Sequence, residues 1–336
     1  PRVFELLGVL LTQPRFDSAR FMLEVSNKQE QVRRQFDSPT GATRVLYYQT
    51  VYGGKLYGRY PTLASLEALT LDAVRRTYQK VYTPALGIAA ISGDLTRAEL
   101  EAALKQGLGA WQGQRAFERP VAQPLVDERL PPPGVYYAYK NINQTSLRLG
   151  HLTDLFENPD RHAVRIMNYA VGVGFTGRLT AKVRSEAGLA YSVGGYFVNR
   201  PKRGSYFAYC QTKADATGQA LRMILDVLQD VQTNGITEEE FTHSKESILN
   251  SFVFEYETPH QVAESVAENL FYGFPADQTD QDLAALQAVT FADCQRVARQ
   301  YYRPQDFRIV VVGDTAQMDQ PLSDFGSVTE LSLEIK

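Results

Sequence analysis

The chain contains a long internal repeat, and this repeat limits the folds open to it more than any single motif. The stretch from Phe21 to Asp94 recurs without a gap 220 residues later, as Phe241 to Asp314. A repeat of this length predicts two copies of one domain, each with its own core. Matching positions include Pro39 with Pro259, Tyr52-Gly53 with Tyr272-Gly273, Thr70 with Thr290, Tyr82-x-Pro84 with Tyr302-x-Pro304, and Gly93-Asp94 with Gly313-Asp314.

The repeat also predicts the domain boundaries. The second copy begins near Gly134, so the first should begin roughly 85 to 90 residues before Pro1. We therefore expect residues 1–113 to be the carboxy-terminal portion of a first domain, and residues 134–336 to be a second domain. Between them, residues 114–133 include the run from Pro131 to Pro133, which resists regular structure and is typical of a linker.

Composition excludes several classes of protein. With 44% hydrophobic and 22% charged residues, the 336-residue chain is ordinary globular material. Its net charge of -3, without clustered Lys and Arg, argues against nucleic-acid binding and favours protein or peptide partners. No apolar run approaches the roughly 20 residues that cross a bilayer. Cys210 and Cys294 lie in apolar segments and are predicted to be buried free thiols, which leaves the compartment open between periplasm and cytoplasm.

Segment patterns indicate the α+β class. In the first copy, Asp17 can cap a helix that ends near Asp37-Ser38-Pro39, and a helix over Leu71–Val81 should precede a strand over Gly87–Ser92. In the second copy, strands and helices come in blocks, which favours a mixed or antiparallel sheet with helices on one face. Strands are expected over Gly134–Tyr139, Ser146–Leu152 and Phe307–Val312 and on both sides of Arg200–Gly204, and helices over Arg161–Val171, Gly177–Glu186, Thr217–Thr233 and Phe291–Tyr301, with a capping box at Thr237 and Glu240.

A glycine-rich loop includes Gly172, Gly174 and Gly177 in the pattern G-x-G-x-x-G. That pattern binds dinucleotides when it follows a strand and when an acidic residue comes about 20 positions later. Here a helical segment precedes it and Phe197 occupies the later position, so the pattern indicates a flexible loop between two helices. The four histidines never fall at i, i+4 spacing, which argues against a zinc site made by this chain alone.

The segment after this loop is the strongest candidate for chemistry. Arg184 should lie in the last turn of a helix that ends at Gly188, and Tyr191 should begin the next strand. A guanidinium and a phenol are both hydrogen-bond donors at neutral pH, so together they suit a peptide carbonyl or the oxyanion formed when it is attacked. The alternative is structural, with Arg184 ion-paired to Glu186 and Tyr191 half-buried.

The chain resembles the pitrilysin/insulinase family of zinc peptidases, which includes the mitochondrial processing peptidases and smaller bacterial members. The resemblance rests on the glycine loop, the Arg184-x-x-x-Gly188-Leu189-x-Tyr191 pattern, Tyr57-Gly58-Arg59-Tyr60-Pro61 and the two-domain repeat. It implies that Arg184 and Tyr191 hold the substrate carbonyl, with the glycine loop near the bound peptide. It also implies a zinc ion bound by a His-x-x-Glu-His helix of the amino-terminal domain, within the residues expected before Pro1.

The same resemblance implies a third zinc ligand within this chain. In the family it is a glutamate about eight residues before the proline that here is Pro39, and counting back reaches Gln31, with Glu30 adjacent. A neutral amide is a poorer zinc ligand than a carboxylate, and a one-residue shift turns a helical side chain by about 100°.

We therefore expect a non-catalytic subunit that brings Arg184 and Tyr191 to a zinc-bearing partner and binds no zinc itself. Two alternatives stay open. The chain could come from a complete zinc peptidase with Glu30 or another carboxylate as third ligand, or it could be a non-enzymatic peptide-binding or structural relative.

Overall fold

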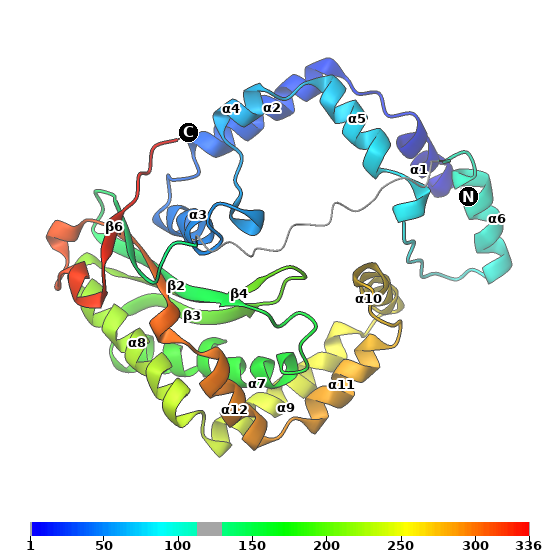
Figure 1. The fold of residues 1–336 in the computed structure, drawn as a ribbon. Helices are drawn as coiled ribbons and strands as arrows, with labels where there is room; N and C mark the ends of the chain where they lie inside the picture. The colour runs from blue at the N-terminus through cyan, green and yellow to red at the C-terminus, as the bar shows by residue number, and fades with distance from the viewer. Residues whose placement is uncertain (1, 113–129, 336) are drawn as a thin grey trace.

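The computed structural model describes residues 2–112 and 130–335. The first of these segments is helical, and its helices form an arch beside a compact α+β body made by the second segment (Figure 1). The helices of the arch are α1 (Arg2–Thr12), α2 (Ser18–Arg33), α3 (Pro39–Val51), α4 (Leu63–Glu67), α5 (Leu71–Val81) and α6 (Arg97–Leu108).

The second segment folds into one sheet and the helices that follow its strands. Its strands are β1 (Gly134–Tyr139), β2 (Gln144–Thr153), β3 (Ala190–Val198), β4 (Gly204–Lys213), β5 (Arg308–Gly313) and β6 (Val328–Glu330). Its helices are α7 (Arg161–Gly172), the π-helical turn η3 (Thr180–Glu186), α8 (Thr217–Asn234), α9 (Glu238–Glu255), α10 (Pro259–Tyr272), α11 (Gln278–Ala288) and α12 (Phe291–Tyr301). These bounds agree with the segments predicted for the second copy to within two residues at each end, except that η3 begins three residues after the predicted Gly177.

The sheet is mixed, with strand order β3-β4-β2-β5-β1-β6. Strands β2, β3, β4 and β5 pair antiparallel, whereas β1 pairs parallel with β5 and β6. This arrangement makes β3 an edge strand, with one row of backbone groups free of sheet partners. The α+β class with a mixed sheet backed by helices is therefore confirmed.

The helices of the second copy pack on one face of the sheet, as predicted, and a helix of the first copy covers the other face. The main core packs α7, α8, α9 and α12 against one face, with Leu149, Ile166 and Val311 almost fully buried. Helix α3 packs against the opposite face, where Val45, Tyr136 and Val310 share a second core. Because α3 comes from the first repeat copy, its packing on the sheet of the second copy could not be predicted from periodicity within either copy.

The repeat is visible in the helices. Helices α3 and α10 begin at the matching prolines Pro39 and Pro259, and α5 and α12 begin one residue after the matching caps Thr70 and Thr290. Each cap threonine accepts a hydrogen bond from the backbone N–H three residues later. The predicted caps at Asp17 and Thr237 are also present.

The predicted strand over Gly87–Ser92 is wrong, because the backbone there is neither strand nor helix. A strand needs a neighbouring strand to bond its backbone groups. All six strands of the described residues belong to the sheet of the second copy, so this segment has no ladder partner among them. Of the predicted linker, residues 114–129 lie outside the described residues, and Leu130–Pro133 contain no helix or strand.

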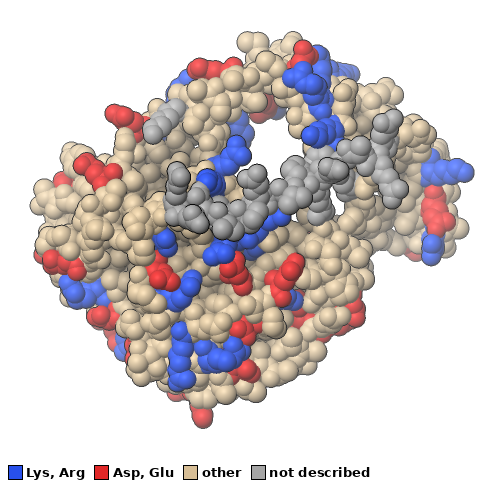
Figure 2. Space-filling view, in the orientation of Figure 1, with Lys and Arg blue, Asp and Glu red and all other residues tan. Residues whose placement is uncertain are grey.

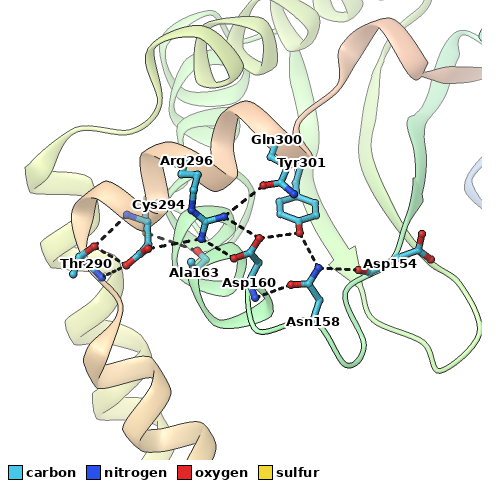
Figure 3. Close-up of polar contacts among 10 residues, drawn as sticks. Asp154, Asn158, Asp160, Ala163, Thr290, Cys294, Arg296, Gln300 and Tyr301 are labelled. Carbon is cyan, nitrogen blue, oxygen red and sulfur yellow. Dashed lines mark hydrogen bonds and ion pairs between the residues drawn. The ribbon is translucent and has the colours of Figure 1, made fainter.

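A polar cluster joins α12 to the loop that leads into α7 (Figure 3). The Arg296 guanidinium binds both oxygens of Asp160, at 2.6 and 3.0 Å. The Tyr301 hydroxyl donates to Asp160 at 2.9 Å and accepts from the Asn158 amide at 3.0 Å. The residues in each contact are separated by 136 to 143 positions in the sequence. The contacts therefore link the first and last helices of the second segment. Among the described residues, no helix is long and apolar enough to cross a membrane.

Candidate functional site

Arg184 is held on a short helix whose other side is buried. Leu179 and Val183 are fully buried against the core, which fixes the backbone of η3 and leaves Arg184 on the exposed side. The helix ends as predicted at Gly188, whose φ of +64° lies in the left-handed region that favours glycine. The Gly188 N–H bonds to the Arg184 carbonyl and the Leu189 N–H bonds to the Val183 carbonyl. The guanidinium is therefore presented from a fixed backbone.

The ion pair expected from the structural alternative is not formed. Glu186 pairs with Lys182 at 2.8 Å, one helical turn away. The Arg184 guanidinium lies instead over the ring of Phe175, 5.5 Å from its centroid, and it has no ion pair within residues 2–112 and 130–335. A cation–π contact leaves all five N–H groups of the guanidinium available to a ligand.

Tyr191 lies in a β-bulge at the start of the edge strand β3. Ala190 pairs with Thr212 and Ser192 pairs with Gln211, so Tyr191 is the extra residue between them. Its side chain is 81% exposed, which also rules out the half-buried alternative. A bulge redirects a side chain relative to the regular alternation of a strand, and no local sequence signal marks it here.

The glycine loop is fixed by backbone contacts with β3. A Cβ atom on Gly172 would lie 2.3 Å from the carbonyl oxygen of Gly195, so only glycine fits at that position. Gly174 adopts a left-handed φ of +72°, and the Thr180 hydroxyl donates to its carbonyl at 3.0 Å. The loop lies between two helices, as predicted, but the contact with Gly194 and Gly195 was not anticipated.

These parts surround a cavity of about 180 Å³ at the edge of the sheet. Arg184 lines the cavity, whereas Tyr191 projects into solvent next to the lining residue Ser192. The structure thus brings the glycine loop and Arg184 together and leaves Tyr191 at the margin, at the start of the edge strand β3. The lining residues are Gly172, Gly174, Phe175, Thr180, Arg184, Ser192, Val193, Tyr196 and Tyr209.

The residues at the expected third-ligand position do not fit a zinc site. Gln31 and Glu30 lie on the exposed side of α2. The Gln31 amide oxygen accepts a hydrogen bond from Lys28 at 3.0 Å, and Glu30 lies 3.7 Å from Arg33. Within the two described segments, no three His, Cys, Asp or Glu side chains come together in a group that could hold a metal ion. Gln31 offers one amide oxygen beside Lys28, and Glu30 offers one carboxylate beside Arg33. The neighbouring positive charges oppose the binding of a further cation.

The buried histidines and cysteines have structural roles. His151 is buried in the core, where its ring nitrogens contact backbone carbonyls. His162 lies 3.5 Å from Asp282 in a group that also contains Arg161. Cys210 and Cys294 are buried free thiols, as predicted, and burial raises the pKa of each thiol to about 12. Such thiols are inert at neutral pH.

Comparison with known proteins identifies the family. The model of the Peptidase M16 inactive domain matches residues 68–248, slightly more than half of the chain. An uncharacterized zinc protease of Streptomyces coelicolor is 26% identical over 281 residues, which are 80% of this chain and 60% of that protein. The non-peptidase homolog YmxG of Helicobacter pylori is 22% identical over 75% of this chain and 58% of its own length. The chain thus spans less than two thirds of these two relatives.

Solved structures show the same fold. A peptidase M16 inactive domain from Pseudomonas fluorescens superposes with a TM-score of 0.83 and 22% identity, covering 93% of this chain and 74% of that one. A chain from complex III of Candida albicans superposes with a TM-score of 0.72 and 13% identity, covering 92% of this chain and 76% of that one. At these identities the likeness concerns the fold alone.

Proposed function

The chain belongs to the peptidase M16 family, and from that premise we propose that it is the non-catalytic partner in a zinc-dependent metalloendopeptidase. In this proposal it supplies Arg184 and Tyr191 to a peptide substrate whose cleavage depends on a zinc-bearing subunit of the same family. One observation carries the proposal: an exposed guanidinium with no ion pair among the described residues lines a cavity at the edge of the sheet, beside an exposed tyrosine on a bulge.

The chemistry of the two side chains suits a carbonyl oxygen that gains negative charge. A guanidinium offers several N–H donors with a positive charge, and a phenol offers one O–H donor. Hydrogen bonds aimed at the developing oxyanion lower the barrier for attack on the carbonyl. The buried side of η3 and the pairing of β3 with β4 fix the backbones of both residues, and the exposed Tyr191 side chain would turn toward the bound peptide.

The edge of β3 offers a way to place the peptide. The Val193 and Gly195 carbonyls of β3 already accept side-chain hydrogen bonds from Thr180 and Asn168, so an added extended strand would bond backbone groups nearer Tyr191. A peptide bound there would run past Tyr191 and the mouth of the cavity. Backbone pairing sets the register but reads little sequence, which suits a peptidase that accepts many unfolded segments.

Zinc would lack one carboxylate ligand in this chain. Gln31 stands at the position where the family has a glutamate, so the proposal assigns the metal to the partner and assigns this chain the substrate-holding groups. We expect the full-length protein alone to bind no zinc tightly. Metal analysis that finds one tightly held zinc per chain would instead favour a complete zinc peptidase.

The test is reconstitution with the zinc-bearing subunit. Peptidase activity should appear in the mixture and be absent from either protein alone. Arg184→Ala and Tyr191→Phe should each lower the joint kcat/KM by a factor on the order of 10² to 10³, the usual loss for one oxyanion donor.

Two control variants match these changes. Lys182→Ala removes another exposed cation from η3, and Tyr139→Phe removes another exposed tyrosine hydroxyl at the end of β1. Both should leave the joint rate unchanged. Unchanged rates with Arg184→Ala and Tyr191→Phe would remove the proposed role of these residues.

A non-enzymatic role is the second candidate, because one relative is named a non-peptidase homolog and one structural neighbour is a chain of complex III. The same mixtures distinguish it. Peptide binding without cleavage in any mixture would favour this candidate over the peptidase subunit.

A further inference from the structure

A second group of cations lies on the sheet face that α3 covers. It consists of Arg44 on α3, Arg148 on β2 and Arg200 in the turn between β3 and β4. The guanidinium groups of Arg148 and Arg200 share the ring of Tyr48, at 5.8 and 5.5 Å from its centroid. Lys and Arg side chains gather around the opening between the arch and the body in the space-filling view (Figure 2). We call Arg44, Arg148 and Arg200 the arginine cluster.

Arg148 is the most enclosed member of the arginine cluster. Its guanidinium lies 4.1 Å from the centroid of Phe207 and 5.8 Å from those of Tyr47 and Tyr48. Burial lowers the pKa of Arg148 from its usual value. Aromatic faces offset part of the cost of removing the charge from water, but they leave the N–H groups without acceptors.

Arg200 also contacts rings rather than carboxylates. Arg200 lies 4.2 Å from the centroid of Tyr57 and 5.5 Å from that of Tyr48. In the part of the chain that the structure describes, no Asp or Glu forms an ion pair with any of the three arginines. Arg44 adds a like charge that lowers the pKa of Arg148 further. An anion that entered this group would therefore meet cations with no competing internal partner.

The arginine cluster is continuous with the candidate site. Tyr209 on β4 lies directly opposite Arg148 on β2, and Tyr209 also lines the cavity that contains Arg184. Tyr196 on β3 stacks on Tyr209 with ring centroids 6.2 Å apart and planes within 5°. A single aromatic surface thus leads from the edge strand across the sheet to Arg148.

We propose that the arginine cluster binds a carboxylate of the peptide that occupies the candidate site. This inference rests on the proposed function, because the ligand is a peptide. It adds a preference to that function: the peptides held best carry Asp, Glu or a free carboxy-terminus where the chain passes over the sheet face. Guanidinium groups bind carboxylates through paired, charge-assisted hydrogen bonds, and partial enclosure strengthens such contacts.

The experiment measures binding rather than cleavage. Fluorescently labelled extended peptides of one length would be compared by anisotropy with the full-length protein. One series carries Glu at successive positions and its matched series carries Gln, each made with a free or an amidated carboxy-terminus. The best Glu peptide should bind about tenfold more tightly than its Gln counterpart, as expected for a hydrogen-bonded charge that leaves water. Amidation shows whether the preferred carboxylate is terminal or on a side chain.

Variants test whether the arginine cluster causes the preference for Glu peptides over Gln peptides. Arg148→Met keeps the apolar stem against Phe207, and Arg200→Gln changes a less enclosed member in case Arg148→Met does not fold. Each should reduce the Glu-to-Gln ratio at least severalfold with little effect on Gln peptides. The matched control is Arg222→Gln, because Arg222 also lies over a ring, 4.9 Å from the centroid of Phe325, but on α8. It should leave the ratio unchanged.

The outcomes separate this inference from the proposed function. Equal affinity for Glu and Gln peptides, or a ratio that survives both Arg148→Met and Arg200→Gln, overturns the carboxylate site and leaves peptide binding intact. Failure to bind any peptide overturns the proposed function and the inference with it.

Discussion

At the scale of single residues, the charge state of the buried His151 ring makes the free energy of unfolding depend on pH. The ring is buried, with Nε2 3.0 Å from the Tyr301 carbonyl and Nδ1 3.2 Å from the Arg303 guanidinium. Nδ1 also lies 2.9 Å from the Leu152 carbonyl, and a neutral ring has one N–H, so it donates to only one of the two carbonyls. Burial lowers the pKa of His151 to about 4.

The lowered pKa predicts a loss of stability in mild acid. The His151 ring takes up a proton near pH 6.5 in the unfolded chain but only near pH 4 in the folded chain. The stability that the neutral ring contributes is therefore complete above pH 6.5 and is lost as the pH falls from 6.5 to 4. The difference corresponds to about 3 kcal/mol in the free energy of unfolding. Urea denaturation from pH 7 to pH 4 should show a flatter profile for His151→Gln. The exposed control His243→Gln should follow the wild type, and a wild-type slope in both variants would contradict the prediction.

The sequence located Arg184 and Tyr191, their helix end and their strand start. It could not locate the bulge at Tyr191, because a bulge depends on which residues β4 places opposite β3. The sequence could not single out Arg148 either, because an arginine is an ordinary residue in a strand. Its enclosure by Phe207 and Tyr47 results from contacts between segments far apart in the chain.

At the scale of elements, the Asp160 cluster should contribute measurably to the joining of α7 and α12 (Figure 3). The Asp160 side chain is 17% exposed and is bound by both Arg296 and Tyr301. Asp160→Asn keeps the size but removes the charge, so we expect a loss of about 1 to 2 kcal/mol in the free energy of unfolding. Asp280→Asn, at an exposed position in α11, should change it by less than about 0.5 kcal/mol. Equal effects of the two variants in urea denaturation would contradict the prediction.

The repeat provides a matched pair of core positions. Leu66 and Leu286 are equivalent, but Leu286 is enclosed beside α7 and α9, whereas Leu66 lines an open apolar pocket between α2, α4 and α5. Leu286→Ala should cost about 3 kcal/mol, because it leaves a closed cavity. Leu66→Ala should cost about half of that or less, because the wall around it is already open. Urea denaturation of both variants measures the difference, and equal costs would contradict it.

Helix prediction succeeded because caps and apolar spacing are local. The matching caps at Thr70 and Thr290 set the same start in both copies. The strand over Gly87–Ser92 failed because a strand also needs a partner. Its counterpart, β5, is a strand because β1 and β2 lie on either side of it.

At the scale of the whole molecule, the two repeat copies differ more than their sequences suggest. The second copy forms the sheet, and helix α3 of the first copy packs against one face of it. The Tyr47 hydroxyl donates to the Tyr206 carbonyl at 2.6 Å, and the Tyr52 hydroxyl donates to the Arg203 carbonyl at 2.9 Å. The contact between copies brings Arg44 over the same sheet face as Arg148. The sequence predicted two domains, but packing between them depends on tertiary contacts that no repeat comparison can provide.

The central claim is that this chain contributes Arg184 and Tyr191 to an active site completed by another subunit. A competition measurement tests it most directly. A fixed amount of the zinc-bearing subunit would receive a constant total of this protein, in which wild type is progressively replaced by the double variant Arg184→Ala, Tyr191→Phe. The account predicts that peptidase activity falls in proportion to the replaced fraction, since the variant still assembles but lacks both donors. Full activity with the double variant alone would contradict it.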